Sequence, residues 1–187
     1  MENIIKSVRL YNQRVRAEFK ESMAELLLHE NFRRLANFRQ HYKYTRLKHS
    51  VDVGYASFYV AKLLGLDYIS AGKAALLHDL CFHEKTGLKS GLKHSIKMLR
   101  QHPKDALENA LEICELSEKE RDIIIRHMWL VTLRPPKYIE GFVVTFVDKY
   151  CASREFITSL FSRNQACKSG EIKDEIKEEI KGELYYG

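Results

Sequence analysis

The sequence predicts an all-α fold, and two observations support this prediction. Only 3 prolines and 9 glycines occur among the 187 residues, so long stretches lack the residues that interrupt helices. Within those stretches, apolar residues recur at three- and four-residue steps, which is the period of a helix with one buried face. The composition, 45% hydrophobic and 30% charged, is that of a folded globular protein. We therefore expect a single helical domain over residues 1–187.

The N-terminal region is expected to begin with a long helix. Apolar residues from Ile4 to Leu28 follow the helical period, which predicts one amphipathic helix over residues 3–29. Residues 30–44 are polar and aromatic, and they predict broken helix and loop.

Two mostly buried helices are expected to follow. The first comes after Thr45, a candidate N-cap, and covers residues 49–64. The second is capped by Asp67 or Ser70 and ends at the adjacent pair His78-Asp79.

The second half of the chain is also expected to be helical, with two interruptions. Glycines and charges predict a loop over residues 82–93, and the pair Pro135-Pro136 predicts a break. Helices are expected over residues 103–114, over residues 117–129 behind the capping box Ser117-Glu118-Lys119-Glu120, over residues 141–161, and as a charged surface helix over residues 171–185.

The charge and the cysteines restrict the partners and the compartment. The net charge of +6 favours anionic partners, but basic residues are interleaved with glutamates and form no clustered stripe, so a nucleic-acid surface is not expected. The four cysteines show no paired spacing, the N-terminus lacks the apolar core of a signal peptide, and no apolar run is long enough to span a membrane. We expect a cytoplasmic protein. The apolar stripe of residues 171–185 could pair with a second copy or pack on its own domain.

A histidine and an aspartate, His78 and Asp79, end a run that otherwise reads as buried helix. Burial of both groups is costly unless something replaces their lost water, and a divalent metal does so because imidazole nitrogen and carboxylate oxygen are both good ligands. In a helical bundle, ligands from several helices can converge on one pocket. The candidate ligands at or beside predicted helices are His49, His78, Asp79, His102, His127 and Asp148.

These residues lie in motifs that resemble the HD-domain metal-dependent phosphohydrolases. Arg46-Leu-Lys-His49-Ser-Val-Asp-Val is similar to the first-histidine helix of that family, Ala75-Leu-Leu-His78-Asp79-Leu to its central motif, and Phe146-Val-Asp148-Lys-Tyr-Cys-Ala to its last motif. Two further stretches are similar to members with a second metal: His102-Pro-Lys-Asp-Ala106 and Ile125-Arg-His127-Met-Trp. The resemblance covers about residues 40–160 and implies an HD-domain helical bundle.

The resemblance also implies a cofactor and an activity. The first metal would be held by His49, His78, Asp79 and Asp148. Asp79 would bridge to a second ion held by His102 and His127, although His94 competes with His102. Manganese, iron, cobalt, nickel or zinc would fit the donors, and magnesium is less favoured because imidazole is a poor ligand for it. The implied reaction is hydrolysis of a small phosphoester, for which a nucleotide is one candidate, by metal-activated water.

Four residues are candidates for a direct part in catalysis. Asp79 would act through the metal, and His83, Lys85 and Arg46 are candidates, on local proximity, for a general acid or a positive group near the leaving oxygen. Two other functions stay open. One is a non-catalytic scaffold that binds metal or nucleotide as a sensor, and the other is a structural bundle whose histidines are coincidental. The number of ions, one or two, also stays open.

Overall fold

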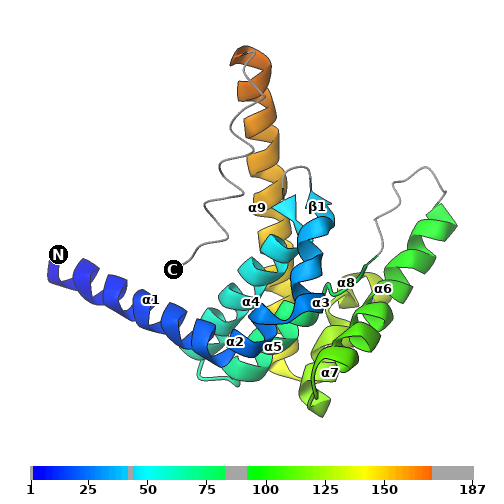
Figure 1. Cartoon of the computed structure of the whole chain (residues 1–187), viewed down its shortest axis with the longest axis horizontal. Coiled ribbons are helices and arrows are strands. Elements are labelled where there is room, and N and C mark those ends of the chain that lie inside the picture. The colour runs from blue at the N-terminus through cyan, green and yellow to red at the C-terminus, as the bar shows by residue number, and fades with distance from the viewer. Residues whose placement is uncertain (1, 42–43, 83–91, 170–187) are drawn as a thin grey trace.

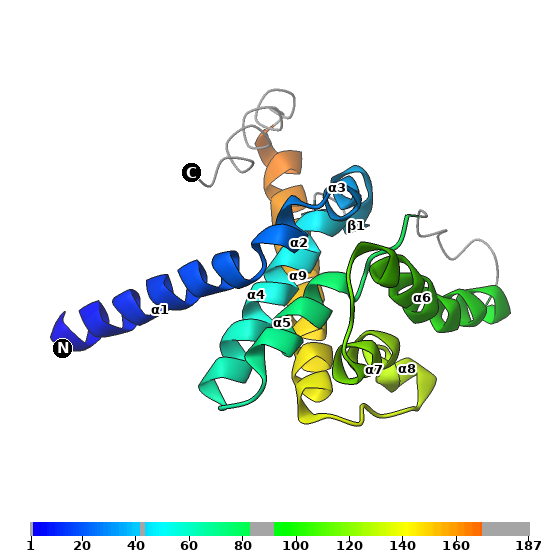
Figure 2. The ribbon, with the colours of Figure 1, turned by 60° about the horizontal axis from the view of Figure 1, so that its bottom comes forward.

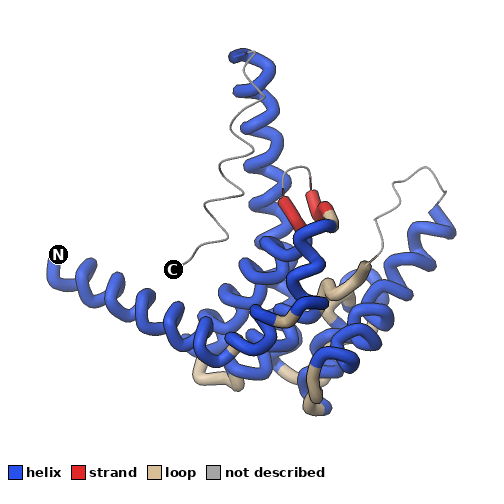
Figure 3. The backbone as a smooth tube through the Cα atoms, in the orientation of Figure 1, coloured by secondary structure: helices blue, strands red, loops and turns tan. Residues whose placement is uncertain are grey.

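The computed structural model describes residues 2–41, 44–82 and 92–169, and its architecture is all-α, as predicted (Figures 1 and 3). The elements in chain order are α1 (Glu2–Ser22), α2 (Ala24–Leu28), α3 (Glu30–Arg33), the 3₁₀ helix η1 (Arg34–Asn37), β1 (Arg39–His41), β2 (Tyr44–Thr45), α4 (Arg46–Leu63), α5 (Tyr68–Leu77), α6 (Leu92–Ile113), α7 (Glu118–Arg126), α8 (Trp129–Thr132) and α9 (Ile139–Ser169).

The N-terminal helix is interrupted where one continuous helix was predicted. Met23 separates α1 from α2 with φ −109° and ψ 8°, outside the helical region. From Val15 onward the apolar stripe of α1 is buried, whereas Val8 is 53% exposed because that part of α1 extends away from the body (Figure 1). Residues 30–44 contain broken helix, as expected, and also a short antiparallel pairing of β1 with β2 that the sequence analysis did not predict.

Helices α4 and α5 lie side by side at the centre, and α9 packs against both (Figure 2). The Thr45 hydroxyl accepts a hydrogen bond from the Lys48 backbone N–H and begins α4, as predicted. Between the two candidate caps of α5, the structure selects Asp67, whose carboxylate accepts from the Ser70 N–H.

Two glycines allow the close approach of α4 and α5. A Cβ on Gly54 would lie 2.7 Å from Cγ of Leu76, and one on Gly72 would lie 3.0 Å from Cβ of Phe58. Leu76 and Phe58 are fully buried, so neither can move aside freely. The spacing between the helices that carry His49 and His78 therefore depends on these two positions.

The prediction for α6 was wrong at its start. The helix begins at Leu92, eleven residues before the predicted Pro103, and continues through that proline. Pro103 lacks only one backbone donor, and the apolar residues Leu92, Ile96 and Leu99 keep the helical period across the junction. His102 consequently lies inside a helix rather than just before one. Of the loop predicted over residues 82–93, residues 83–91 lie outside the described residues.

The single helix predicted over residues 117–129 is divided by a turn at His127 and Met128 into α7 and α8. Ser117 and Glu120 form the complete capping box at the start of α7, and residues 133–138, including both prolines, separate α8 from α9. α9 is longer at both ends than the predicted range of 141–161, and the predicted helix over 171–185 lies outside the described residues. Cys81, Cys114 and Cys151 are reduced thiols. Among the helices of the described ranges, none combines the length and apolarity needed to cross a membrane.

We expect Gly54→Ala and Gly72→Ala each to lower the free energy of unfolding by about 1–3 kcal/mol, because the added methyl group overpacks the α4–α5 contact. Helix propensity alone predicts the opposite sign, a gain of up to about 1 kcal/mol. Urea denaturation of each variant measures the sign. A stabilised variant would show that α4 and α5 can separate without cost.

Candidate metal centre

The six candidate ligands come from five different helices or helix ends. His49 lies in the first turn of α4, and His102 and Asp148 lie within α6 and α9. His78 and His127 are the C-cap residues of α5 and α7, and Asp79 follows His78. The chain thus places its ligands where helices end or pack on one another.

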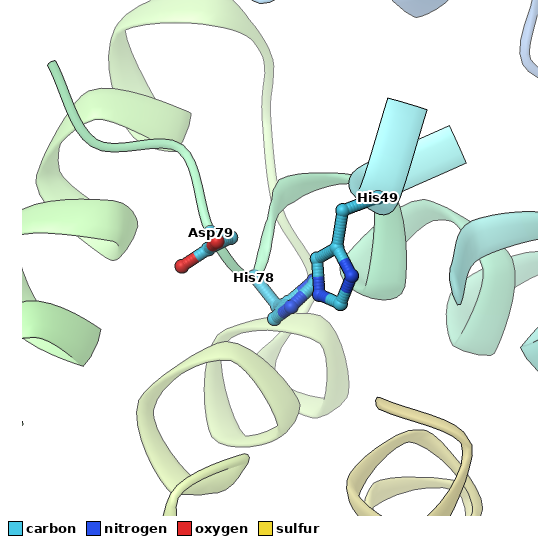
Figure 4. Close-up of side chains that lie close together, drawn as sticks. All are labelled: His49, His78 and Asp79. Atoms are coloured by element: carbon cyan, nitrogen blue, oxygen red, sulfur yellow. The ribbon is translucent and has the colours of Figure 1, made fainter. Parts of the chain in front are cut away.

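Three of the ligands form a compact buried group (Figure 4). His49, His78 and Asp79 each offer one ligand atom, and these atoms all lie within 4.8 Å of one another. The three residues are at most 2% exposed. Their arrangement could hold a metal ion.

Asp148 joins this group through both histidines. Its Oδ1 atom lies 3.1 Å from Nε2 of His49 and 3.5 Å from Nε2 of His78. Two ligand atoms that share one ion at bond lengths near 2.1 Å are separated by about 3.0–3.4 Å in octahedral or tetrahedral geometry. The separation from His49 lies within that range and the separation from His78 lies just above it, so a small shift would let these donors share an ion.

The remaining two histidines lie beside Asp79 and His78. Nε2 of His102 is 2.5 Å from Oδ1 of Asp79, and the ring centroids of His102 and His127 are 5.7 Å apart. The ring of His127 also lies 5.1 Å from that of His78. The structure therefore brings all six predicted ligands together around Asp79 and His78. The His102–Asp79 distance is that of a hydrogen bond, so an ion between these two groups would have to replace the proton they share.

In each of the four histidines, the Nδ1 atom points away from the other candidate ligands and contacts a different group. The Nδ1–H groups of His78 and His127 donate to the carbonyls of Ala75 and Ile124, at 2.6 and 2.7 Å. Such bonds fix the ring orientation and leave Nε2 to act as the metal ligand.

The other two Nδ1 atoms contact side chains. Nδ1 of His49 lies 2.9 Å from Oε1 of Glu155, and Nδ1 of His102 lies 3.3 Å from Sγ of Cys81. The Cys81 thiol in turn donates to the His102 carbonyl at 3.5 Å. The sulfur therefore lies behind the imidazole of His102, on the side away from Asp79.

In the metal-free site, the pKa of His49 is raised and the pKa of His127 is lowered. Burial lowers the pKa of His49, but hydrogen bonds to Asp148 and Glu155 outweigh burial and raise that pKa to about 9. Burial, together with the charges of His78 and His102, lowers the pKa of His127 to about 3. Burial raises the pKa of Asp148, but hydrogen bonds from His49 and His78 hold it well below its ordinary value. His49 thus carries a proton at neutral pH that a metal would displace, whereas His127 is already neutral.

Glu155 is the residue that the sequence analysis missed. It is fully buried on α9, and it contacts a ligand rather than offering one. Its position seven residues after Asp148 places both carboxylates on the same face of the helix. That spacing is the signal by which it could have been found.

Of the candidates for a group near the leaving oxygen, the structure describes Arg46 but not His83 or Lys85. Arg46 is 1% exposed, its Nε lies 3.7 Å from Oδ2 of Asp79, and its guanidinium donates to the Cys81 carbonyl. It therefore supports the segment that carries Asp79. His83 and Lys85 lie outside the described residues, and the side chain of His94 is likewise not described.

We expect the metal-free protein to be most stable near pH 6.5. The folded pKa of His49, about 9, is above its unfolded value, so its stabilisation is complete below pH 6.5 and is lost as the pH rises toward 9. The folded pKa of His127, about 3, is below its unfolded value, so stability is lost as the pH falls from 6.5 toward 3. The lowered pKa of Asp148 adds to the loss in acid.

Thermal unfolding in excess chelator between pH 4 and pH 10 measures this profile. His49→Asn should flatten the alkaline side, where the contribution of His49 is about 3 kcal/mol. An alkaline slope that persists unchanged in His49→Asn would contradict the assignment.

A scan against protein-family models, a search of curated proteins and a search of solved structures found no match to this chain.

Proposed function

We propose that the chain is a metal-dependent phosphohydrolase of the HD type that acts on a small phosphoester, with a nucleotide as one candidate. The observation that carries the proposal is the convergence of four imidazoles and two carboxylates, spread over one hundred residues of sequence, on one buried site. In a structural bundle with coincidental histidines, nothing would direct Nε2 of His49, His78 and His102 toward buried carboxylates.

The donors favour a transition metal. Imidazole nitrogen and carboxylate oxygen suit manganese, iron, cobalt, nickel and zinc, and the imidazole-rich side around His102 and His127 disfavours magnesium. Cys81, the nearest thiol to these histidines, contacts the Nδ1 side of His102, so its sulfur is not placed as a ligand. The donors around His49 and Asp148 suit one ion, and a second ion at His102 would require His102 and Asp79 to move apart from their 2.5 Å contact.

The protein residues would have distinct tasks. A bound divalent ion lowers the pKa of water and polarises a phosphoryl oxygen, which is the chemistry that phosphoester hydrolysis needs. Asp79 would link the two sides of the site, and Arg46 would hold its carboxylate in place from 3.7 Å. The side chain of His102 is 13% exposed, against 7% or less for His49, His78, Asp79 and Asp148, so a substrate would approach from the α6 side.

The first test is metal content by elemental analysis, combined with a screen of phosphoesters. Protein purified without chelators should contain one or two transition-metal equivalents per chain and should release phosphate. Asp79→Asn, which keeps the size of the side chain, should lose metal and reduce turnover about 100-fold or more. The control is Asp52→Asn, because Asp52 also lies near the site helices but pairs with Arg154 at the surface.

The outcomes separate the proposed functions. Metal binding without turnover on any phosphoester would leave a sensor scaffold in place of an enzyme. No metal after manganese, iron or zinc is offered, together with an Asp79→Asn variant that is not destabilised, would leave the structural bundle.

A second prediction concerns the number of ions. If the protein holds two ions, His102→Ala should reduce the content to one, because the first group of ligands remains complete. His102 is partly exposed, so its removal should leave the fold intact. His29→Ala is the control, because His29 caps α3 through the Asn31 N–H and takes no part in the site. An unchanged metal content in His102→Ala would exclude His102 from the ligands.

A further inference from the structure

Glu155 is a buried carboxylate whose contacts point to a function beyond packing. It is 0% exposed, and its Oε1 atom lies 2.9 Å from Nδ1 of His49. Its Oε2 atom is buried and has no hydrogen-bond partner among the described residues. A buried carboxylate with half of its acceptors unused is costly, and replacement by an apolar residue would remove that cost.

Within residues 2–41, 44–82 and 92–169, the side-chain contacts found give this charge no partner besides His49. Arg154, the preceding residue, directs its guanidinium to Asp52 at 2.9 Å. The side-chain contact that Glu155 does make is with His49, across the packing of α9 on α4. The carboxylate is therefore directed to one nitrogen of one predicted ligand.

Two carboxylates on α9 contact the two ring nitrogens of His49. Asp148 contacts Nε2 of His49 at 3.1 Å, and Glu155, two helical turns later, contacts Nδ1 at 2.9 Å. The imidazole is therefore fixed in one rotation, with Nδ1 toward Glu155 and Nε2 toward the site. A carboxylate that accepts from the far N–H of an imidazole also increases the basicity of its ligand nitrogen.

We propose that Glu155 is a positioning residue that holds His49 through its Nδ1–H and thereby strengthens the bond from Nε2 to a divalent metal. This inference rests on the proposed metal site and adds a residue to it. Glu155 itself touches neither metal nor substrate. Removal of its charge with retention of its shape should weaken metal binding through His49 alone.

The experiment is a Co²⁺ titration of chelator-treated full-length protein, followed by the visible absorption of the bound ion. Glu155→Gln should lower the affinity about 10–100-fold. The matched control is Glu140→Gln, because Glu140 is a second buried carboxylate on α9 but pairs with Lys119 at 2.9 Å. Its affinity should equal that of the unaltered chain.

A double variant separates action through His49 from a general loss of negative charge. In a His49→Asn background, Glu155→Gln should cause no additional loss of Co²⁺ affinity. An equal loss in both backgrounds would overturn the proposal in favour of a general electrostatic effect. An affinity of Glu155→Gln within about twofold of the unaltered chain would overturn it in favour of a structural tie between α4 and α9.

The unaltered chain supplies a test that needs no foldable variant at position 155. Loaded with Zn²⁺, it should retain a downfield ¹H–¹⁵N resonance from the Nδ1–H of His49, and an imidazole without this proton would overturn the proposal. Failure of the unaltered chain to bind any metal would overturn both this inference and the proposed function. Metal binding without phosphate release would overturn only the proposed enzyme activity.

Discussion

The structure depends on the compensation of charge inside its core. Three carboxyl groups, those of Asp79, Asp148 and Glu155, lie buried beside four imidazoles. Among the described residues, Arg46 and Lys149 are the permanent cations that contact these carboxyl groups. The carboxyl group of Glu155 contacts His49 at 2.9 Å, and His49 also contacts Asp148. Buried charge of this kind is tolerated only when a proton or a cation balances it.

A proton on His49 balances that charge in the metal-free protein, and this explains why the pKa of His49 rises despite its burial. A divalent ion would take over the same task at the same nitrogen. Metal and proton thus compete for one position, which couples metal affinity to pH and to the stability of the fold. The packing of α4, α5 and α9 around the site depends on the same compensation of buried charge.

Much of this arrangement could be predicted from the sequence. Composition and periodicity predict the helices, and the residues Thr45, Asp67 and Ser117 predict three of their beginnings because capping is a local interaction. The buried His-Asp pair predicts a metal site, and the resemblance to the HD motifs is what assigns the six candidate ligands to it. Their convergence could not be predicted, because it depends on how α4 approaches α5, which two glycines determine.

The errors have local causes. The helix start expected at Pro103 was wrong, because the apolar period on its N-terminal side continues the helix back to Leu92. The strands β1 and β2 are too short to show an alternating pattern. Glu155 was not predicted, although its spacing of seven residues from Asp148 places both carboxylates on one face of the helix. Only the fold shows that Arg154 turns to Asp52 while Glu155 turns inward.

The partners behind the four imidazoles also make the two sides of the site unequal. His49 is backed by a carboxylate, and His78 and His127 by backbone carbonyls, all of which are strong acceptors at short distance. His102 is backed by the sulfur of Cys81, a weaker acceptor, and is the more exposed side chain. The orientation of His102 is therefore less firmly fixed than that of His49. The firmly held group, His49, His78 and Asp148, is the part of the site that the packing of the core prepares in advance, and His102 is the part that is more open to solvent.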